Sequence, residues 1–191
     1  MPLITRDMNL DAAWKKVLQQ VQTANEDPGH SFRYMDLATV DAENQPVQRT
    51  VVLRDFDGKK TFSIFTDARS RKVKHIQGND QVSLLFYDDD TKLQLSVQGK
   101  ATLLTNGEKW ERYWKEAGSK SPHSYTSAKA PGAIIDEPED AYEWLQEENK
   151  HFCVVRIQAY KMTFLQLDGK RHLRGVQEFV EGQTNSRWIA P

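Results

Sequence analysis

The sequence has very little cysteine, because Cys153 is the only one among 191 residues. A single thiol excludes a disulfide within the chain and any metal site built from cysteines. It stands in the apolar segment Phe-Cys-Val-Val, which predicts a buried and unreactive thiol. This usage fits a reducing compartment, and we expect a cytoplasmic protein.

Long apolar runs and an excess of one charge are also missing. No uncharged stretch is long enough to span a membrane, and the first ten residues, which include Arg6 and Asp7, do not resemble a signal peptide. The net charge of −1 provides no broad field toward nucleic acid or acidic lipid. We therefore expect no nucleic-acid or membrane partner, and any cationic site must be a local cluster.

Several motifs that would define an active site are absent. The chain has no G-x-G-x-x-G sequence, no Walker loop and no G-x-S-x-G elbow. Its histidines do not have the spacing of metal ligands, so we expect no metal. They are His30, His75, His123, His151 and His172.

What is present predicts one mainly β domain over 1–191, with a helix within 1–30 and a helical insertion at 106–150. Periodicity and turn residues predict helices at 11–24, 70–77, 108–117 and 140–149, and a loop over a site at 120–138. They predict strands at 32–40, 47–56, 61–66, 82–87, 92–104, 152–167 and 172–180. This order favours an antiparallel barrel with helical decoration.

Three details of these elements can be tested against the structure. The nearly continuous apolar strand 82–87 is expected to be buried on both faces. Gly99 predicts a bulge or bend in the strand that contains it. Trp144 and Leu145 are expected to point inward from the helix 140–149.

A cationic cluster is the most informative feature. Arg49, Arg54, Arg71 and Lys72 surround two apolar strands and the start of a helix that Ser70 is expected to cap. Basic residues in a first helical turn are unfavourable unless an anion compensates them. Strands that carry arginine and lysine, with no glycine loop, suit a compact planar ligand with a phosphate. Flavin mononucleotide (FMN) is such a ligand.

Two further groups allow more than one interpretation. Gln94, Ser96 and Gln98 share one face of a strand, which either hydrogen-bonds a heteroaromatic ring or meets water. The basic segment 170–174 either completes a phosphate site or forms an ordinary hairpin.

Five segments in order resemble the pyridoxamine 5'-phosphate oxidase family over about 32–191. They are R-T-V-V-L-R, F-T-D-A-R-S-R-K, V-S-L-L-F-Y, L-Q-L-S-V-Q-G-K-A and R-W-I-A-P. The resemblance implies an FMN-binding split β-barrel that works as a homodimer, with FMN at the interface. The cofactor-binding residues that it implies are Arg49, Thr50, Val51, Val52, Leu53, Arg54, Phe65, Thr66, Ser70, Arg71, Lys72, Gln94 and Arg174.

The resemblance is weaker on the substrate side. The family's phosphate-binding Tyr, Arg and Ser fall on Tyr113, Ala117 and Ser121, so the arginine is missing. Its Arg-x-His pair becomes Arg171-His172. Its Gln-Ser pair falls on Lys129-Ala130, and its tryptophan near the flavin falls on Leu165.

These departures favour an FMN-binding oxidoreductase acting on another small substrate. The flavin would supply the chemistry, so no catalytic residue is assigned. One alternative is a genuine pyridoxamine or pyridoxine 5'-phosphate oxidase, and another is a flavin or haem carrier without enzymatic activity. A nucleic-acid-binding barrel is the least supported.

Overall fold

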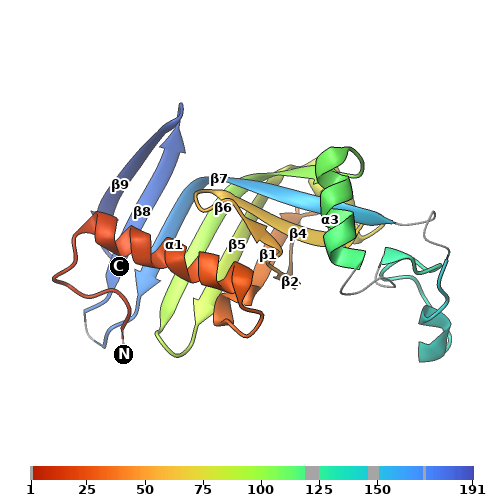
Figure 1. The fold of residues 1–191 in the computed structure, drawn as a ribbon, viewed down its shortest axis with the longest axis horizontal. Helices are drawn as coiled ribbons and strands as arrows, with labels where there is room; N and C mark the ends of the chain where they lie inside the picture. The colour runs from red at the N-terminus through yellow and green to blue at the C-terminus, as the bar shows by residue number, and fades with distance from the viewer. Residues whose placement is uncertain (1, 119–124, 146–150, 170) are drawn as a thin grey trace.

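The computed structural model describes residues 2–118, 125–145, 151–169 and 171–191 (Figure 1). Its helices are α1 Leu10–Glu26, η1 Ser31–Arg33, α2 Arg71–Gly78, α3 Glu108–Gly118 and η3 Pro138–Ala141. Its strands are β1 Tyr34–Val40, β2 Pro46–Val52, β3 Asp55–Phe56, β4 Thr61–Asp67, β5 Gln81–Asp88, β6 Leu93–Leu104, β7 Phe152–Gln166, β8 Leu173–Val180 and β9 Gln183–Ile189. In the described ranges, no helix has the length and apolar character needed to cross a membrane.

All strand pairs in the sheet are antiparallel, as predicted, in the order β2-β1-β5-β6-β7-β4-β3. Outside this order, the long strand β7 also pairs with β8, and β8 pairs with β9. The two ends of the main order, β2 and β3, are separated in the chain only by Leu53 and Arg54. The sheet must therefore curl until its edges meet. The Leu53 amide donates to Arg33 on one side and the Arg54 amide to Ser63 on the other.

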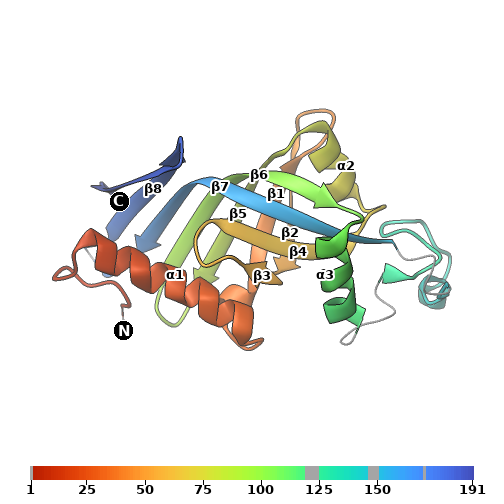
Figure 2. The same cartoon turned by 45° about the horizontal axis from the view of Figure 1, so that its top comes forward.

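Helix α1 crosses the strands near one end of β7, and α3 lies near the other end (Figures 1 and 2). The apolar stripe of α1 packs into the main core, where Trp14 meets the Phe164 ring edge-on at 5.0 Å between centroids. A second, smaller core joins α3 to the start of β7. It contains Trp110, Tyr113, Ala117, Phe152 and Val154.

Strand β5 is not buried on both faces, contrary to the prediction. Its side chains alternate between buried and exposed, and Leu85 and Tyr87 are 38% and 42% exposed. Tyr34 on neighbouring β1 is 61% exposed on the same outer face. An apolar run therefore does not require a strand to be buried on both faces, because the apolar side chains of Leu85 and Tyr87 face outward.

Two predicted elements differ from the structure, and one strand was not predicted. The strand 47–56 is broken at Leu53 and Arg54, where the chain passes from one sheet edge to the other. The described part of 140–149 is not an α-helix: η3 ends at Ala141, and Trp144 is 44% exposed and bridges to Ser127. The C-terminal segment forms β9, which was not predicted, because its side chains are mostly polar and exposed.

Cys153 is fully buried on β7, as predicted, and burial raises the pKa of its thiol to about 11. We expect iodoacetamide to leave the native protein unmodified at about pH 8, because both access and the thiolate are lacking. In denaturant the same thiol should react fully, so mass spectrometry of the two samples gives zero and one adduct. Rapid modification of the native protein would contradict the burial.

Candidate functional site

The predicted cationic cluster centres on Arg49 and Lys72. Arg49 on β2 lies opposite Leu37 in the sheet register and donates through Nη1 to the Leu37 carbonyl at 3.1 Å and to Thr39 Oγ1 at 2.7 Å. Lys72 on α2 donates through Nζ to Thr66 Oγ1 at 2.9 Å. Both cations are half-buried, and both have hydroxyl partners rather than carboxylates among the described residues.

The electrostatics of this pair are unfavourable without an anion. Burial lowers the pKa of Lys72, and the nearby charge of Arg49 lowers it further. Burial likewise lowers the pKa of Arg49. Asp67 is close enough to act on Lys72, but its carboxylate is held by Arg69 at 2.7 Å. Two half-buried positive charges thus act on each other, and Asp67 opposes this effect on Lys72 only in part.

The start of α2 adds to this cationic region. Ser70 is the N-cap residue, as predicted, but its side chain does not cap the helix; it lies 3.3 Å from Thr66 Oγ1 instead. The first turn contains no acidic residue, and Arg71 is exposed there. The Val73 amide donates to the Ser70 carbonyl at 3.0 Å, and the amides of Arg71 and Lys72 before it are the ones that a helix start leaves without intrahelical partners. Residues from β2, β4 and α2 therefore converge on one positively charged region.

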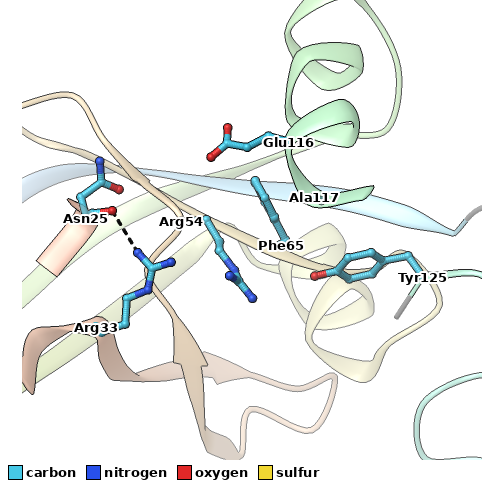
Figure 3. Close-up of a pocket in the computed structure, with 7 residues that line it drawn as sticks. All are labelled: Asn25, Arg33, Arg54, Phe65, Glu116, Ala117 and Tyr125. Atoms are coloured by element: carbon cyan, nitrogen blue, oxygen red, sulfur yellow. Dashed lines mark hydrogen bonds between the residues drawn. The ribbon is translucent and has the colours of Figure 1, made fainter. Parts of the chain in front are cut away.

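The second part of the predicted site lies where β2 passes to β3. Arg54 stands over the Phe65 ring, with Cζ 5.8 Å from the ring centroid. Both line a pocket with Asn25, Arg33, Glu116, Ala117 and Tyr125 (Figure 3). Phe65 and Thr66 are consecutive on β4, so their side chains point to opposite faces of the strand: Phe65 packs with the second core, and Thr66 contacts Lys72. The segment contains four more predicted residues. Thr50 is exposed and donates a hydrogen bond through Oγ1 to Asp36. Val51 and Val52 are half-buried, and Leu53 is fully buried.

Gln94 and Arg174 do not join this site within one chain. The register places Gln94 between Tyr87 and Leu165, and Leu165 lies opposite Arg174. These residues share the outer face of the sheet, whereas Arg49 lies opposite buried Leu37 on the inner face. Gln94 is therefore not inside the barrel, and the interpretation that its face points outward is the one the structure supports. Nε of Arg174 is buried with no hydrogen-bond partner.

The predicted substrate residues are also separated. Tyr113 is buried, contacts Phe65 at 5.4 Å between ring centroids, and donates a short hydrogen bond to Asp55. Arg171 and His172 are exposed in the turn after β7. Tyr113 packs against Phe152, the first residue of β7, whereas Arg171 and His172 follow the last one. The 15 residues of β7, about 45 Å of extended chain, therefore separate Tyr113 from Arg171 and His172. Ser121 lies outside the described residues.

Two arginines near the site were not predicted from the sequence. Arg69 pairs with Asp67 and also donates to the carbonyls of Ser127, Ala128 and Lys129 at 2.7 to 3.3 Å. It thereby holds the segment that includes the Lys129-Ala130 pair against the end of β4. The other is Arg33, which the fold brings beside Arg54 from η1. Neither role has a local sequence signal, because each depends on contacts between distant segments.

Comparisons with known proteins agree with this geometry. Residues 11–105 match the family model "Pyridoxamine 5'-phosphate oxidase, FMN-binding domain". A pyridoxine/pyridoxamine 5'-phosphate oxidase of Crocosphaera subtropica is 37% identical over 105 residues, which cover 55% of this chain and 49% of that protein. The chain thus matches about half the length of this relative.

Two solved structures share the fold over nearly the whole chain. One is a pyridoxamine 5'-phosphate oxidase-related, FMN-binding protein from Nostoc punctiforme, with a TM-score of 0.76 at 22% identity, covering 96% of this chain and all of that one. The other is PhzG from Burkholderia lata in complex with tetrahydrophenazine-1-carboxylic acid, with a TM-score of 0.73 at 17% identity, covering 97% and 95%. With the matched FMN-binding domain and the related sequence, these findings show that the chain belongs to the pyridoxamine 5'-phosphate oxidase-like family.

Proposed function

We propose that this protein is an FMN-dependent oxidoreductase with a split β-barrel fold that acts as a homodimer. The observation that carries the proposal is the Arg49–Lys72 pair, in which two half-buried cations lie together without a carboxylate partner in the described ranges. A phosphate group satisfies this arrangement, because it neutralises both charges and accepts charge-assisted hydrogen bonds.

The donor set fits FMN. Arg49, Lys72, Ser70 and Arg71 would hold the phosphate, and the first-turn N–H groups of α2 favour an anion at the same place. Phe65, Thr66 and the backbone from Thr50 to Arg54 would line the rest of the cofactor. When bound, FMN supplies the redox chemistry of hydride transfer. The side chains of this chain bind it, orient it and shape the space next to it.

A second copy of the chain would complete the site. Gln94 and Arg174 lie on the outer face of the sheet, where Tyr34, Leu85 and Tyr87 form an exposed apolar surface. A dimer formed through this face would cover the apolar side chains and could bring Gln94 and Arg174 to the partner's cofactor. The same arrangement would bring Arg171 and His172 toward a substrate held near the Phe65 ring of the other copy.

True pyridoxamine 5'-phosphate oxidation is the main alternative. It is favoured by the relative from Crocosphaera subtropica, whose name states that activity. It is disfavoured by Ala117, which lines the pocket where the resemblance expects an arginine. A flavin or haem carrier would use the same cationic region without turnover.

The deciding experiment is an absorption spectrum of the purified protein, followed by release and chromatography of the bound molecule. We expect flavin bands and FMN in the released fraction. A colourless protein that also takes up no added FMN would contradict the proposal. If FMN is bound, incubation with pyridoxamine 5'-phosphate and detection of pyridoxal 5'-phosphate would distinguish the main alternative. A bound haem spectrum would favour the carrier.

A further inference from the structure

The inner face of β1 carries a hydroxyl group where its neighbours are apolar. Met35, Leu37 and Thr39 alternate along this face, and all three are buried, with Thr39 only 1% exposed. Threonine has nearly the shape of valine, but its hydroxyl group is costly to bury without hydrogen-bond partners. Thr39 Oγ1 has two partners, and each comes from a different element of the proposed phosphate site.

The first partner is Arg49 on β2. Arg49 lies opposite Leu37 in the register, so Thr39 is its diagonal neighbour on the same face. Its Nη1 donates to the Leu37 carbonyl at 3.1 Å and to Thr39 Oγ1 at 2.7 Å. Because a guanidinium group is planar and rigid, two acceptors at one nitrogen fix the orientation of the whole group. Neither bond uses Nε or Nη2, which can therefore contact a ligand.

The second partner is His75, on the helix α2 that packs against β1. Its Nδ1 lies 2.9 Å from Thr39 Oγ1. A guanidinium group can only donate, so Thr39 Oγ1 accepts from Arg49 and keeps its own proton for another acceptor. If Nδ1 donated as well, this proton would remain unpaired in a buried place, at a cost in stability. The hydroxyl group therefore donates to Nδ1, and the proton of the neutral His75 ring lies on Nε2.

The other side of His75 faces a cavity of about 490 Å³ between α2 and the turn after β1. Two bases, Arg71 and Lys74, and two acids, Asp41 and Glu43, line this cavity with it. These charges balance, so the cavity does not indicate a ligand of either sign. The contact that connects His75 to the proposed phosphate site is its hydrogen bond to Thr39.

We propose that Thr39 and His75 are positioning residues for the phosphate of the cofactor. His75 orients the Thr39 hydroxyl group, and this hydroxyl group orients the guanidinium group of Arg49. The inference rests on the proposed function, in which Arg49 holds the phosphate of FMN. Both residues act through Arg49 rather than on the ligand itself, so their effect is confined to flavins that carry a phosphate.

Conservative variants separate these hydrogen bonds from packing. Thr39→Val keeps the shape of the side chain and removes the hydroxyl group, whereas Thr39→Ser keeps the hydroxyl group. His75→Leu removes the acceptor, whereas His75→Asn can place Oδ1 where Nδ1 stands, because both side chains branch at Cγ. Thr102→Val, at an exposed position of β6, is the matched control for loss of a threonine hydroxyl group. Melting temperatures are measured for all variants.

The flavin-free proteins are titrated with FMN and with riboflavin, which lacks the phosphate. The pH is about 8, above the range in which histidine ordinarily takes up a proton, and quenching of flavin fluorescence gives both affinities. We expect Thr39→Val to weaken FMN binding about tenfold, the value of one charge-assisted contact, and to leave riboflavin binding unchanged. His75→Leu should also weaken FMN binding alone. Thr39→Ser, His75→Asn and Thr102→Val should bind both flavins like the wild type.

The His75 ring provides a measurement that needs no flavin. In nitrogen NMR spectra of protein labelled at histidine, Nε2 should carry the proton, and Nδ1 should give the resonance of an acceptor in a hydrogen bond. Thr39→Val should shift the Nδ1 resonance. A proton on Nδ1 in the wild type at the same pH would overturn the direction of the hydrogen bond and with it the role of His75.

The outcomes distinguish this inference from the proposed function. Unchanged FMN affinity in Thr39→Val, equal losses for FMN and riboflavin, or an equal loss in Thr39→Ser would overturn the positioning role while FMN binding stands. Failure of the wild type to bind FMN would contradict the proposed function instead. Inorganic phosphate would then decide the inference: weaker thermal stabilisation by phosphate in Thr39→Val than in the wild type would support it, and equal stabilisation would overturn it.

Discussion

Replacement of both Arg49 and Lys72 by methionine is expected to reduce FMN affinity at least about a hundredfold. Each half-buried cation would contribute a charge-assisted contact to the phosphate, worth about 1.5–3 kcal/mol. Since about 1.4 kcal/mol corresponds to a tenfold change in affinity, loss of two contacts reaches two orders of magnitude or more. The measurement is titration of the flavin-free protein with FMN, followed by quenching of flavin fluorescence.

The folded state should tolerate this change. The two cations repel each other in the absence of an anion, since the charge of Arg49 contributes to the lowered pKa of Lys72. Methionine retains most of the length of both side chains, and relief of the repulsion opposes the loss of the hydrogen bonds to Leu37, Thr39 and Thr66, so we expect the flavin-free variant to melt close to the flavin-free wild type. A large loss of FMN affinity without loss of stability would separate ligand binding from structural support.

Lys74→Met is the matched control for this experiment. Lys74 lies on the same helix but is exposed, so its removal changes the net charge by the same amount per residue without removing a phosphate contact. Its FMN affinity should remain close to that of the wild type. Equal losses in Lys74→Met and Lys72→Met would mean that the attraction is a diffuse field rather than a built site. Unchanged affinity in the double variant would place the FMN phosphate elsewhere.

The sequence correctly predicted those features of the site that depend on neighbouring residues, namely the start of α2 and the alternation of side chains along β6. Helical periodicity and the position of Ser70 predicted α2 within one residue at each end, so Arg71 and Lys72 were placed correctly in its first turn. Strand alternation correctly separated Gln94 from Leu93 and Leu95. Alternation alone does not tell which face is inside, because that depends on how the whole sheet curls.

Long-range closure explains what could not be predicted. The run Val51-Val52-Leu53 has strong strand propensity throughout, yet the chain breaks there because β2 and β3 occupy different edges of the sheet. That break directs Arg54 toward Phe65. The approach of Arg33 to Arg54 likewise depends on the Arg33 carbonyl accepting from the Leu53 amide across the closure. A cluster formed in this way has no spacing that can be read along the chain.

Gly99→Ala is expected to destabilise the fold by about 2–3 kcal/mol, because forced contacts in a packed region typically cost about 1–3 kcal/mol and this one meets backbone. A Cβ at Gly99 would lie 2.7 Å from the Gln158 carbonyl oxygen and 3.0 Å from Ile157 Cγ2. The first atom belongs to the neighbouring strand β7, and the second to a fully buried side chain. Neither can move without disturbing the sheet.

The bulge predicted at Gly99 explains why the strands approach so closely there. Gln98 pairs with Lys161 and Gly99 with Ala159, so Tyr160 is the extra residue, and it lies on β7 rather than on β6. Bulges increase the local twist and bend the strand. Gly99 thus provides the space for the bend on the opposite strand, and a larger residue would oppose the curvature that closes the sheet.

Gly78→Ala provides the control, because both substitutions add one methyl group. Gly78 ends α2, no neighbouring atom lies within 4 Å of the place that its added methyl group would take, and its backbone is not left-handed. Since alanine is favoured over glycine in a helix by up to about 1 kcal/mol, this variant should be at least as stable as the wild type.

Urea unfolding of the Gly99→Ala and Gly78→Ala proteins gives the comparison. For a chain of this length, a loss of about 2–3 kcal/mol corresponds to a melting temperature lower by about 4–12 °C. Equal stability of the two variants would mean that β6 and β7 move apart at little cost, and that the close contact at Gly99 does not hold the curvature of the sheet.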